Sequence, residues 1–532
     1  MRVGIDLGTT HTVVAVAHRG NYPVVSFQTD GGEVHQWYPA IVGARSDELA
    51  YGLDAYDKQH AEGWTFLRSF KRLLSQHGPD TPVRIGDRQV PLLELLAGYL
   101  TQLRRDLRER SNLEIGPRDT LDSFIAVPAN ANSNQRFLTA EGFRRAGFNV
   151  IGMINEPSAA GIEYAERFAN RGLTGRRVFL AVYDLGGGTF DSSVIGMKDQ
   201  QHEVITDEGI SELGGDDFDA ILLDLALSRL GNPAEIDELA RFELLEECRR
   251  QKESLSPNRR RITIDVSRAF KGAGEVIVPV DEFYERCAPL VELTVEALER
   301  AMERALEKIG IGWLDVAAVY LTGGSSDLPI VGRLLRERYG RRVRRSPFPY
   351  SATAIGLAIA ADSGRTHELH EHFTRYFGLW RESDCGRRVV FDTIFAKDTP
   401  LLGPSDPPLT RIRTYNPAHN IGHYSFLECS RLSPEGEPDG DITPWGDILF
   451  ELDPSLYGRS GLSESAVRRM ESLSDQLIEE RYTCDARGVI TVTIANLTAG
   501  YERTYTIRAS GRASVPPRRR SRLAAPAARP GS

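Results

Sequence analysis

The sequence has few cysteines and no long hydrophobic run. Its 532 residues include five cysteines, which lie far apart and form no Cys-x-x-Cys pair. This spacing argues against a disulfide framework or a zinc ribbon, and it fits a reducing compartment. No apolar stretch reaches membrane-spanning length, and a strand-like segment begins at Arg2, which leaves no room for a signal peptide. We therefore expect a cytoplasmic protein that is not inserted in a membrane.

Basic charge is not in excess either. The formal net charge is −9, which gives no argument for a nucleic-acid partner. Hydrophobic residues make up 41% of the chain and charged residues 26%, as in ordinary soluble proteins. A chain of this length and composition can form two to four units that each bury a core.

The most informative stretch is residues 179–195, FLAVYDLGGGTFDSSVI, which reads as a strand, a tight turn and a second strand. Three glycines in the turn remove every Cβ, so that backbone N–H groups can close on an anion. The flanking Asp184 and Asp191 can hold a hydrated Mg²⁺ that bridges to phosphate. Taken alone, the stretch fits either a phosphate and metal site or a glycine-rich β-hairpin turn with solvated carboxylates.

A second hairpin pattern favours the phosphate site. Residues 2–17, RVGIDLGTTHTVVAVA, place Asp6 in the same setting as Asp184, between an apolar strand and a glycine turn. A third glycine pair, at 323–324, follows the apolar run 316–321. Matching hairpins of this kind indicate a duplicated α/β lobe, with the two turns facing each other across a cleft.

Five motifs carry a family resemblance. They are IDLGTT (5–10), INEPSAAGIEY (154–164), YDLGGGTFD (183–191), LGGDDFD (213–219) and LTGGSSDLP (321–329). Together they resemble the seventy-kilodalton heat-shock chaperones of the DnaK type, which belong to the actin and sugar-kinase ATPase superfamily. The FKRLL segment around Lys71 and the long NEPSAA and GGDDFD matches narrow the resemblance to the chaperone branch, over residues 1–361.

The resemblance implies a domain order. Residues 1–362 are expected to form an α/β, two-lobed, actin-like ATPase domain with ribonuclease H-like duplicated lobes, followed by a charged linker at 363–375. Residues 376–510 are expected to form a mostly β, substrate-binding-like sandwich, with a helical insertion near 455–476 and its clearest alternating strand at 488–495. We expect no counterpart of the family's α-helical lid, and the Pro- and Arg-rich residues 511–532 are expected to be disordered.

The linker differs from that of the family. The chaperones join their domains by a leucine-rich segment that docks as a strand when ATP is bound, whereas this linker is charged and rich in histidine. We therefore expect no docking strand and little coupling between the domains. The histidines in HELHEH lack the spacing of a metal-binding HExxH motif, which favours a solvated segment over a metal site.

The resemblance also implies roles for individual residues. The residues expected to act on the attacking water and the γ-phosphate are Lys71, Glu156, Asp184 and Thr189. Those expected to order Mg²⁺ through water are Asp6 and Asp191. Contacts to ATP are expected from Gly8, Thr9, Thr10, Gly186, Gly187, Gly188, Gly215, Lys252, Ser256, Gly323, Gly324 and Ser325.

Some of these residues have plainer interpretations. Lys71 lies among apolar residues at helical spacing, where a lysine usually faces solvent. Glu156 begins a helix, and an acid is favourable there without any function. Pro128 and Arg136 resemble the pair that passes the nucleotide state to the neighbouring domain in the family, although Pro128 can simply end a strand. The unbroken NEPSAA match favours the role in the cleft for Glu156.

The sequence departs from the family where the family binds adenine. Two arginines that sandwich the base in the family are replaced by Glu253 and Asp327, and Arg249 stands where the family has an acid. Arg249 and Glu253 are four residues apart on one expected helix, so they can pair. Each missing cation–π contact is worth roughly 0.5 to 2 kcal/mol. We therefore expect nucleotide affinity to come mainly from the phosphates and Mg²⁺, with weak discrimination between ATP and GTP.

The expected function is that of a DnaK-type ATPase. In this interpretation, ATP hydrolysis regulates the binding of a polypeptide client, and co-chaperones are further partners. The alternative is a nucleotide-gated adaptor that binds one dedicated protein partner with little turnover. A third hypothesis is a small-molecule kinase of the same superfamily, but the GGDDFD and NEPSAA motifs and the β domain argue against it.

Overall fold

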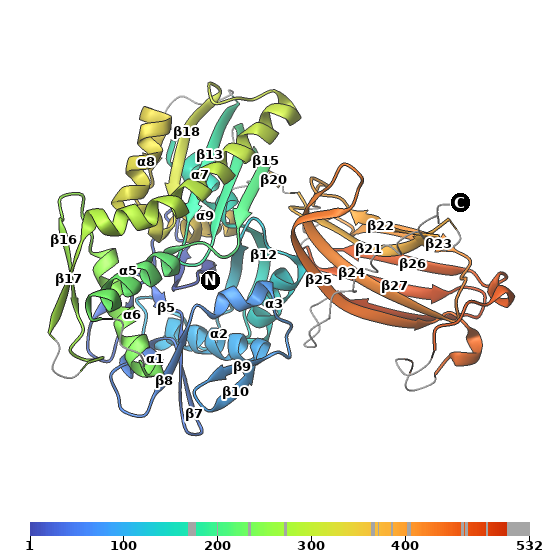
Figure 1. The fold of residues 1–532 in the computed structure, drawn as a ribbon, viewed down its shortest axis with the longest axis horizontal. Coiled ribbons are helices and arrows are strands. Elements are labelled where there is room, and N and C mark those ends of the chain that lie inside the picture. The colour runs from blue at the N-terminus through green and yellow to red at the C-terminus, as the bar shows by residue number, and fades with distance from the viewer. Residues whose placement is uncertain are drawn as a thin grey trace, which may run out of the picture.

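The computed structural model shows two α/β lobes side by side and a β domain next to them (Figure 1). It describes residues 1–168, 177–198, 201–231, 236–270, 274–362, 368–370, 372–384, 387–401, 406–458, 462, 466–485 and 488–507. The fold class expected from the resemblance is confirmed. The expected disordered tail lies outside the described residues, and no described helix is long and apolar enough to cross a membrane.

The first lobe is built on a sheet with the strand order β12-β11-β1-β2-β5. Strands β1 and β2 form the first hairpin, β11 pairs with β1 in parallel, and β12 pairs in parallel with β11. The strands of this sheet are β1 (Arg2–Leu7), β2 (His11–Val16), β5 (Tyr38–Pro39), β11 (Asp122–Val127) and β12 (Asn149–Asn155). Its helices are α1 (Leu53–Asp57), α2 (Leu92–Glu109), α3 (Ser133–Arg145) and α4 (Glu156–Phe168).

Smaller sheets extend the first lobe. Strands β6, β7 and β8 form one, β9 and β10 a second, and β3 and β4 a third. Their bounds are β3 (Phe27–Gln28), β4 (Val34–His35), β6 (Ile41–Arg45), β7 (Glu48–Tyr51), β8 (Thr65–Arg68), β9 (Pro82–Ile85) and β10 (Arg88–Pro91). The segment expected to be one helix around Lys71 is instead β8 followed by the 3-10 helix η1 (Phe70–Ser75). The two are separated by Ser69, whose φ of 56° breaks the helical path.

The second lobe repeats the plan with the strand order β19-β18-β13-β14-β15-β20. Its strands are β13 (Val178–Leu185), β14 (Phe190–Lys198), β15 (Gln201–Ile210), β18 (Val316–Thr322), β19 (Val343–Arg345) and β20 (Glu368–His370). The lobe also has a hairpin of β16 (Arg261–Asp265) and β17 (Glu275–Pro279). Its helices are α5 (Gly215–Arg229), α6 (Glu238–Glu253), α7 (Val280–Ile309) and α8 (Pro329–Tyr339). The last helix, α9 (Ala352–Ala361), returns to the first lobe and packs on β1, β2 and β11 and on α4.

The linker contains a docked strand, so the expectation of no docking strand is wrong. Strand β20 pairs in parallel with the edge strand β15, with Gln201 opposite Glu368 and Glu203 opposite His370. Pairing along a sheet edge uses backbone N–H and C=O groups, so a linker without a leucine-rich run can still make it. The linker is therefore physically joined to the lobe that carries the second hairpin.

The described residues of the β domain form two four-stranded sheets, with the orders β22-β21-β24-β25 and β23-β26-β27-β28. Its strands are β21 (Tyr376–Ser383), β22 (Arg388–Phe395), β23 (Leu409–Tyr415), β24 (Ile421–Leu432), β25 (Pro438–Glu451), β26 (Ile478–Cys484), β27 (Ile490–Asn496) and β28 (Tyr501–Thr506). Aromatic side chains such as Phe377, Phe426 and Tyr482 form its core. The alternating pattern expected at 488–495 corresponds to β27, which buries Ile490, Val492 and Ile494.

The described part of the expected helical insertion contains no α-helix. It has two 3-10 turns, Pro454–Leu456 and Glu471–Leu473. Between them, the backbone of Arg468 accepts a hydrogen bond from Asn420, and that of Met470 donates one to Ala418. The segment is thus held as an extended loop against the start of β24, because its backbone groups pair with a neighbouring segment rather than within a helix.

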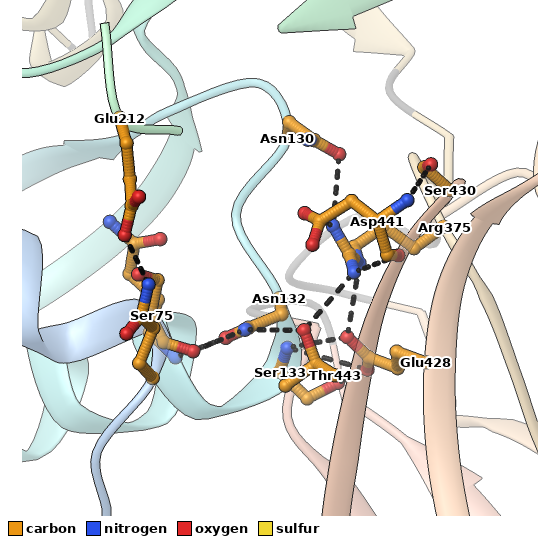
Figure 2. Close-up of polar contacts among 12 residues, drawn as sticks. Ser75, Asn130, Asn132, Ser133, Glu212, Arg375, Glu428, Ser430, Asp441 and Thr443 are labelled. Carbon is orange, nitrogen blue, oxygen red and sulfur yellow. Dashed lines mark hydrogen bonds and ion pairs between the residues drawn. The ribbon is translucent and has the colours of Figure 1, made fainter. Parts of the chain in front are cut away.

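The β domain contacts the first lobe through a buried polar cluster (Figure 2). The Glu428 carboxylate on β24 accepts a hydrogen bond from the Ser133 backbone N–H at 3.2 Å, at the start of α3. Arg375, just before β21, lies 3.7 Å from Glu428 and 2.8 Å from Asp441. Both Arg375 and Glu428 are buried, so this contact is part of the interior of the folded chain.

Candidate active site

A cleft of about 600 Å³ lies between the two lobes. Both hairpin turns line it, as do the third glycine pair and one face of α6. All of the site residues expected from the sequence line this cleft except Gly188 and Asp191. Asp191 lines a small adjoining cavity together with Thr9, Lys71 and Thr189. The structure thus brings residues from distant parts of the chain to one place.

The two hairpin turns contact each other directly. A Cβ on Gly187 would lie 2.8 Å from the Thr10 side chain, and one on Gly188 would lie 2.6 Å from the Thr9 side chain. Real Cβ atoms do not approach other atoms so closely, so only glycine allows the turns to meet. Residues 186–188 thus carry no side chains that could cover their backbone, and Gly186 and Gly187 line the cleft. The N–H groups of Gly8 and Gly186 already donate within their own turns, to the carbonyls of Asp6 at 3.1 Å and Thr189 at 3.0 Å.

The start of α5 packs against the glycine turn at residues 186–188 and donates hydrogen bonds to it. The Gly215 N–H donates to the Gly186 carbonyl at 3.0 Å, and the Asp216 N–H donates to the Gly187 carbonyl at 2.8 Å. A Cβ on Gly214 would lie 2.6 Å from the Gly187 carbonyl carbon. The glycines of the LGGDDFD motif pack closely against the GGG turn. Larger residues at these positions would displace the turn.

Lys71 and Glu156 meet in the interior of the cleft. The Lys71 Nζ lies 2.7 Å from the Glu156 Oε1, and both side chains are largely buried. The solvent-facing interpretation of Lys71 is therefore wrong. Although burial alone would lower the pKa of Lys71, the charges of Glu156 and Asp6 raise it above its ordinary value. Lys71 is a cation fixed beside the glycine turns.

The carboxylates of the cleft are in an environment that disfavours their charge. Burial raises the pKa of Asp6 and of Asp191 to about 7, and the nearby Glu156 charge adds to both shifts. Burial also raises the pKa of Asp184, as do Glu156 and Asp6. A bound divalent cation would relieve this repulsion between buried carboxylates.

These carboxylates do not form a closed metal cage. In the described part of the chain, no group of three or more His, Cys, Asp or Glu side chains is arranged to hold a metal ion directly. Mg²⁺ binds few protein carboxylates and keeps several of its waters. The arrangement of Asp6 and Asp191 thus fits a magnesium ion held through water and phosphate.

Lys252 and Ser325 lie beside the glycine turn on the second lobe. The Lys252 Nζ donates to the Gly215 carbonyl at 2.8 Å and lies 2.7 Å from the Asp219 Oδ1. A Cβ on Gly215 would lie 2.5 Å from the Ser325 Oγ. Ser256, one turn after Lys252, also lines the cleft. These polar groups fit the sugar of a nucleotide whose phosphates lie at the turns.

Arg249 does not pair with Glu253, so that expectation is wrong. Its guanidinium contacts Asp216 at 3.1 Å, Asp219 at 3.2 Å and Glu246 at 2.6 Å. Three carboxylates hold it in place, none of them Glu253, and the side chain is nearly buried. Arg249 is therefore not available to lie over a nucleotide base.

The sequence motifs missed several residues that line the cleft, and four of them are His11, Trp37, Arg345 and Tyr350. His11 and Trp37 have ring centroids 4.3 Å apart. Burial, followed by the charge of Arg68, lowers the pKa of His11 to about 3, so this imidazole is neutral at physiological pH. His11 directly follows the DLGTT motif and could have been noticed, whereas no local pattern marks the other three.

A short path joins the cleft to the β domain. The Asn130 backbone N–H donates to the Asp191 Oδ1 at 3.3 Å. The side chain of the same residue accepts from Arg375 at 3.4 Å, as Figure 2 shows. Arg136 donates to Asn155 at 2.6 Å, and its Cδ would lie 2.9 Å from a Cβ on Gly488 of the β domain. The loop before α3 and the start of α3 therefore contact both the cleft and the β domain.

Comparison with known proteins gives consistent matches. The family model described as Hsp70 protein matches residues 2–370. Chaperone protein HscA of Cronobacter sakazakii (strain ATCC BAA-894) is 32% identical over 377 residues, which cover 68% of this chain and 58% of that protein. Chaperone protein HscA of Escherichia coli (strain K12 / DH10B) is 32% identical over 376 residues, with the same coverage. The chain thus spans 58% of the length of these relatives.

Proposed function

The chain belongs to the Hsp70 family, and from this premise we propose that it binds and hydrolyses ATP and that its nucleotide state regulates the binding of a polypeptide client. The observation that supports the ATPase most strongly is the buried Lys71–Glu156 pair beside two glycine turns. Phosphoryl transfer depends on positioning and on neutralising charge rather than on covalent help from the protein. The cleft supplies both.

Each residue has a distinct role in this proposal. Backbone N–H groups of the two turns, 8–10 and 186–188, bind the phosphates, except those of Gly8 and Gly186, which donate within the turns. Lys71 stabilises the charge that develops on the γ-phosphate, and Glu156 and Asp184 orient the attacking water and accept its proton. The Thr189 hydroxyl, half-buried in the same cleft, lies where it can hold that water. Lys252 and Ser256 bind the nucleoside.

Magnesium completes the proposed site. Asp6 and Asp191 would hold the ion through water, because they are close to the turns without forming a direct cage. When bound, the ion neutralises negative charge on the phosphates. Lys71 balances part of the negative charge that remains on the phosphates. The Lys71 ammonium is held in place for this role by its ion pair with Glu156.

The polypeptide-binding half of the proposal rests on the β domain and its attachment. We propose 1–362 as the ATPase domain, 363–375 as the linker and 376–510 as the substrate-binding domain. Strand β20 joins the linker to the second lobe, and Arg375 and Glu428 join the β domain to the first lobe. The contact of Arg375 lies close to the cleft, because Asn130 accepts from Arg375 and donates its backbone N–H to Asp191. A change of nucleotide can therefore alter the contact between the β domain and the first lobe. The β20 contact lies farther away, at the end of β15 remote from the glycine turn.

The family membership does not favour the adaptor alternative, since the relatives are named as chaperone proteins. We propose polypeptide clients and co-chaperones as the partners of this chain. We also propose a cytoplasmic location, because Cys248, Cys287, Cys429 and Cys484 are buried free thiols, as expected in a reducing compartment. Cys385 lies outside the described residues.

The experiment that tests this function is a multiple-turnover ATPase assay on the purified full chain. We expect hydrolysis of Mg-ATP by the wild type, stimulation by an unfolded polypeptide, and loss of both in the Lys71→Ala variant. Hydrolysis that continues unchanged in Lys71→Ala would show that the assigned site is wrong. Absence of any stimulation by unfolded polypeptide would favour the adaptor.

A further inference from the structure

One end of the cleft differs from the phosphate end. The two glycine turns lie at one end, and Lys252, Gly215 and Ser325 lie next to them. Beyond Ser325, the wall continues through Gly324 to Tyr350, which packs on it. A nucleotide with its phosphates at the turns therefore extends its base toward Tyr350.

The Tyr350 ring is both fixed and accessible. A Cβ on Gly324 would lie 2.6 Å from the Tyr350 Cε1, so the ring rests directly on the glycine backbone. Tyr350 nevertheless remains 43% exposed, and it lines the cleft. Burial and the charges of Asp327 and Glu253 raise the pKa of Tyr350 to about 12, so the ring is a neutral phenol at physiological pH. A neutral, exposed aromatic ring at this position is a surface on which a base can stack.

Asp327 holds an arginine beside this ring. Arg345, at the end of β19, forms an ion pair with the Asp327 Oδ2. Half of the Arg345 side chain is exposed, and the residue lines the cleft. The buried Oδ1 of Asp327 has no hydrogen-bond partner in the described structure. The acid in the LTGGSSDLP motif thus does not leave the base end of the cleft without a cation, because it positions one from a different strand.

Building on the proposed ATPase function, we propose that Tyr350 and Arg345 form the base-binding wall of the nucleotide site and that Asp327 positions Arg345 there. Stacking on a ring and on a guanidinium plane accepts any base, because every base has a π-face. The expected weak discrimination between ATP and GTP is therefore retained. The base nevertheless contributes to nucleotide affinity, because it stacks on Tyr350 and Arg345. An Asp327→Arg substitution would release Arg345 instead of restoring a missing contact.

The test is equilibrium titration calorimetry with three probes: Mg-ATP, Mg-GTP and magnesium tripolyphosphate, which has no base or sugar. The variants are Tyr350→Leu, Tyr350→Phe, Arg345→Ala and Asp327→Asn. Arg344→Ala is the matched control, since it is the neighbouring arginine on the same strand, in register with Tyr320 rather than Leu321. Thermal unfolding of each variant checks that it remains folded.

We expect Tyr350→Leu and Arg345→Ala to weaken ATP and GTP binding by about tenfold to a hundredfold, the size of a lost base-stacking contact. Tripolyphosphate affinity should not change in either variant. Tyr350→Phe and Arg344→Ala should behave as wild type, and Asp327→Asn should resemble Arg345→Ala.

Wild-type ATP and GTP affinity in Tyr350→Leu would overturn the proposal, as would an equal loss of tripolyphosphate binding. If Tyr350→Leu fails to fold, Arg345→Ala decides the matter by the same criteria. A wild-type protein that binds no nucleotide would instead contradict the proposed function itself, so the two failures are distinguishable.

Discussion

Lys71 and Glu156 come from different elements of the first lobe, η1 and the start of α4, and form a buried ion pair with a separation of 2.7 Å. Burying two charges is costly unless further groups compensate them. Here the pair lies beside three more carboxylates, Asp6, Asp184 and Asp191, and beside the glycine turn at residues 186–188. We interpret the pair as part of a site for a charged ligand rather than as a device for stability.

The first prediction concerns hydrolysis. Lys71→Ala and Thr189→Ala should each leave nucleotide affinity largely intact but lower the single-turnover rate by about 10²- to 10³-fold, because each removes a contact to the reacting groups. Lys58→Ala, an exposed lysine of the same lobe, is the control and should hydrolyse ATP at the wild-type rate. A wild-type rate in Lys71→Ala would contradict the site.

The second prediction concerns the glycines under the phosphate turn. Gly214→Ala should abolish tight binding of Mg-ATP, because the added Cβ would lie 2.6 Å from the Gly187 backbone and displace the turn. Gly312→Ala, whose Cβ would meet nothing within 4 Å, is the matched control. The measurement is the dissociation constant of Mg-ATP. Equal affinities for the two variants would show that the turn does not bind phosphate.

The third prediction concerns the contact between the domains. Arg375→Ala should leave Glu428 buried without its cation, which is strongly destabilising for that contact. We expect faster amide hydrogen exchange at the Ser133 N–H and along β24, with little change in α7. Arg388→Ala, on the exposed start of β22, serves as the control. Unchanged exchange at Ser133 in Arg375→Ala would mean that the cluster does not hold the domains together.

The fourth prediction concerns pH and the core of the first lobe. The buried Asp106 accepts a hydrogen bond from the Tyr38 hydroxyl at 2.7 Å, and burial raises its pKa from 3.8 to about 6. The folded protein therefore binds this proton more tightly than the unfolded chain does. The stability that this provides is fully present below about pH 4 and is lost as the pH rises through 6.

This pH effect can be isolated with Asp106→Asn, which removes the titrating group. Lowering the pH from 7.5 to 5 should raise the unfolding temperature of the wild type relative to that of the variant. Parallel pH profiles for the two proteins would show that the pKa of Asp106 is not raised.

The sequence was sufficient to predict the lobes and most of the cleft. The glycine turns, Lys71 and the carboxylates lie in short motifs. The residue types in these motifs are determined by local geometry; Gly187 and Gly188, for example, leave no space for a Cβ atom. Strand β27 was predicted from its alternation, since one face is buried. These features depend mainly on residues close to one another in the chain.

The rest depends on contacts between distant segments. The linker strand β20 pairs through backbone groups, which no side-chain pattern reports. From the sequence, Asp327 indicates that a cation has been lost from the base end of the cleft. In the structure, β19 places Arg345 beside Asp327. Arg249 looks like a partner for Glu253 until α5 brings Asp216 and Asp219 to it. In each case the partner comes from another element, so local spacing could not predict it.

The central claim is that the nucleotide bound in the cleft regulates polypeptide binding in the β domain. It is tested most directly by the dissociation rate of a fluorescently labelled unfolded polypeptide from the full chain, with Mg-ATP or Mg-ADP present. Strand β20 joins the linker to the second lobe, and the Arg375–Glu428 contact joins the β domain to the first lobe. In place of the weak coupling expected from the linker sequence, we therefore predict a difference of at least about tenfold, as is typical of coupled sites. Equal dissociation rates with the two nucleotides would contradict the claim.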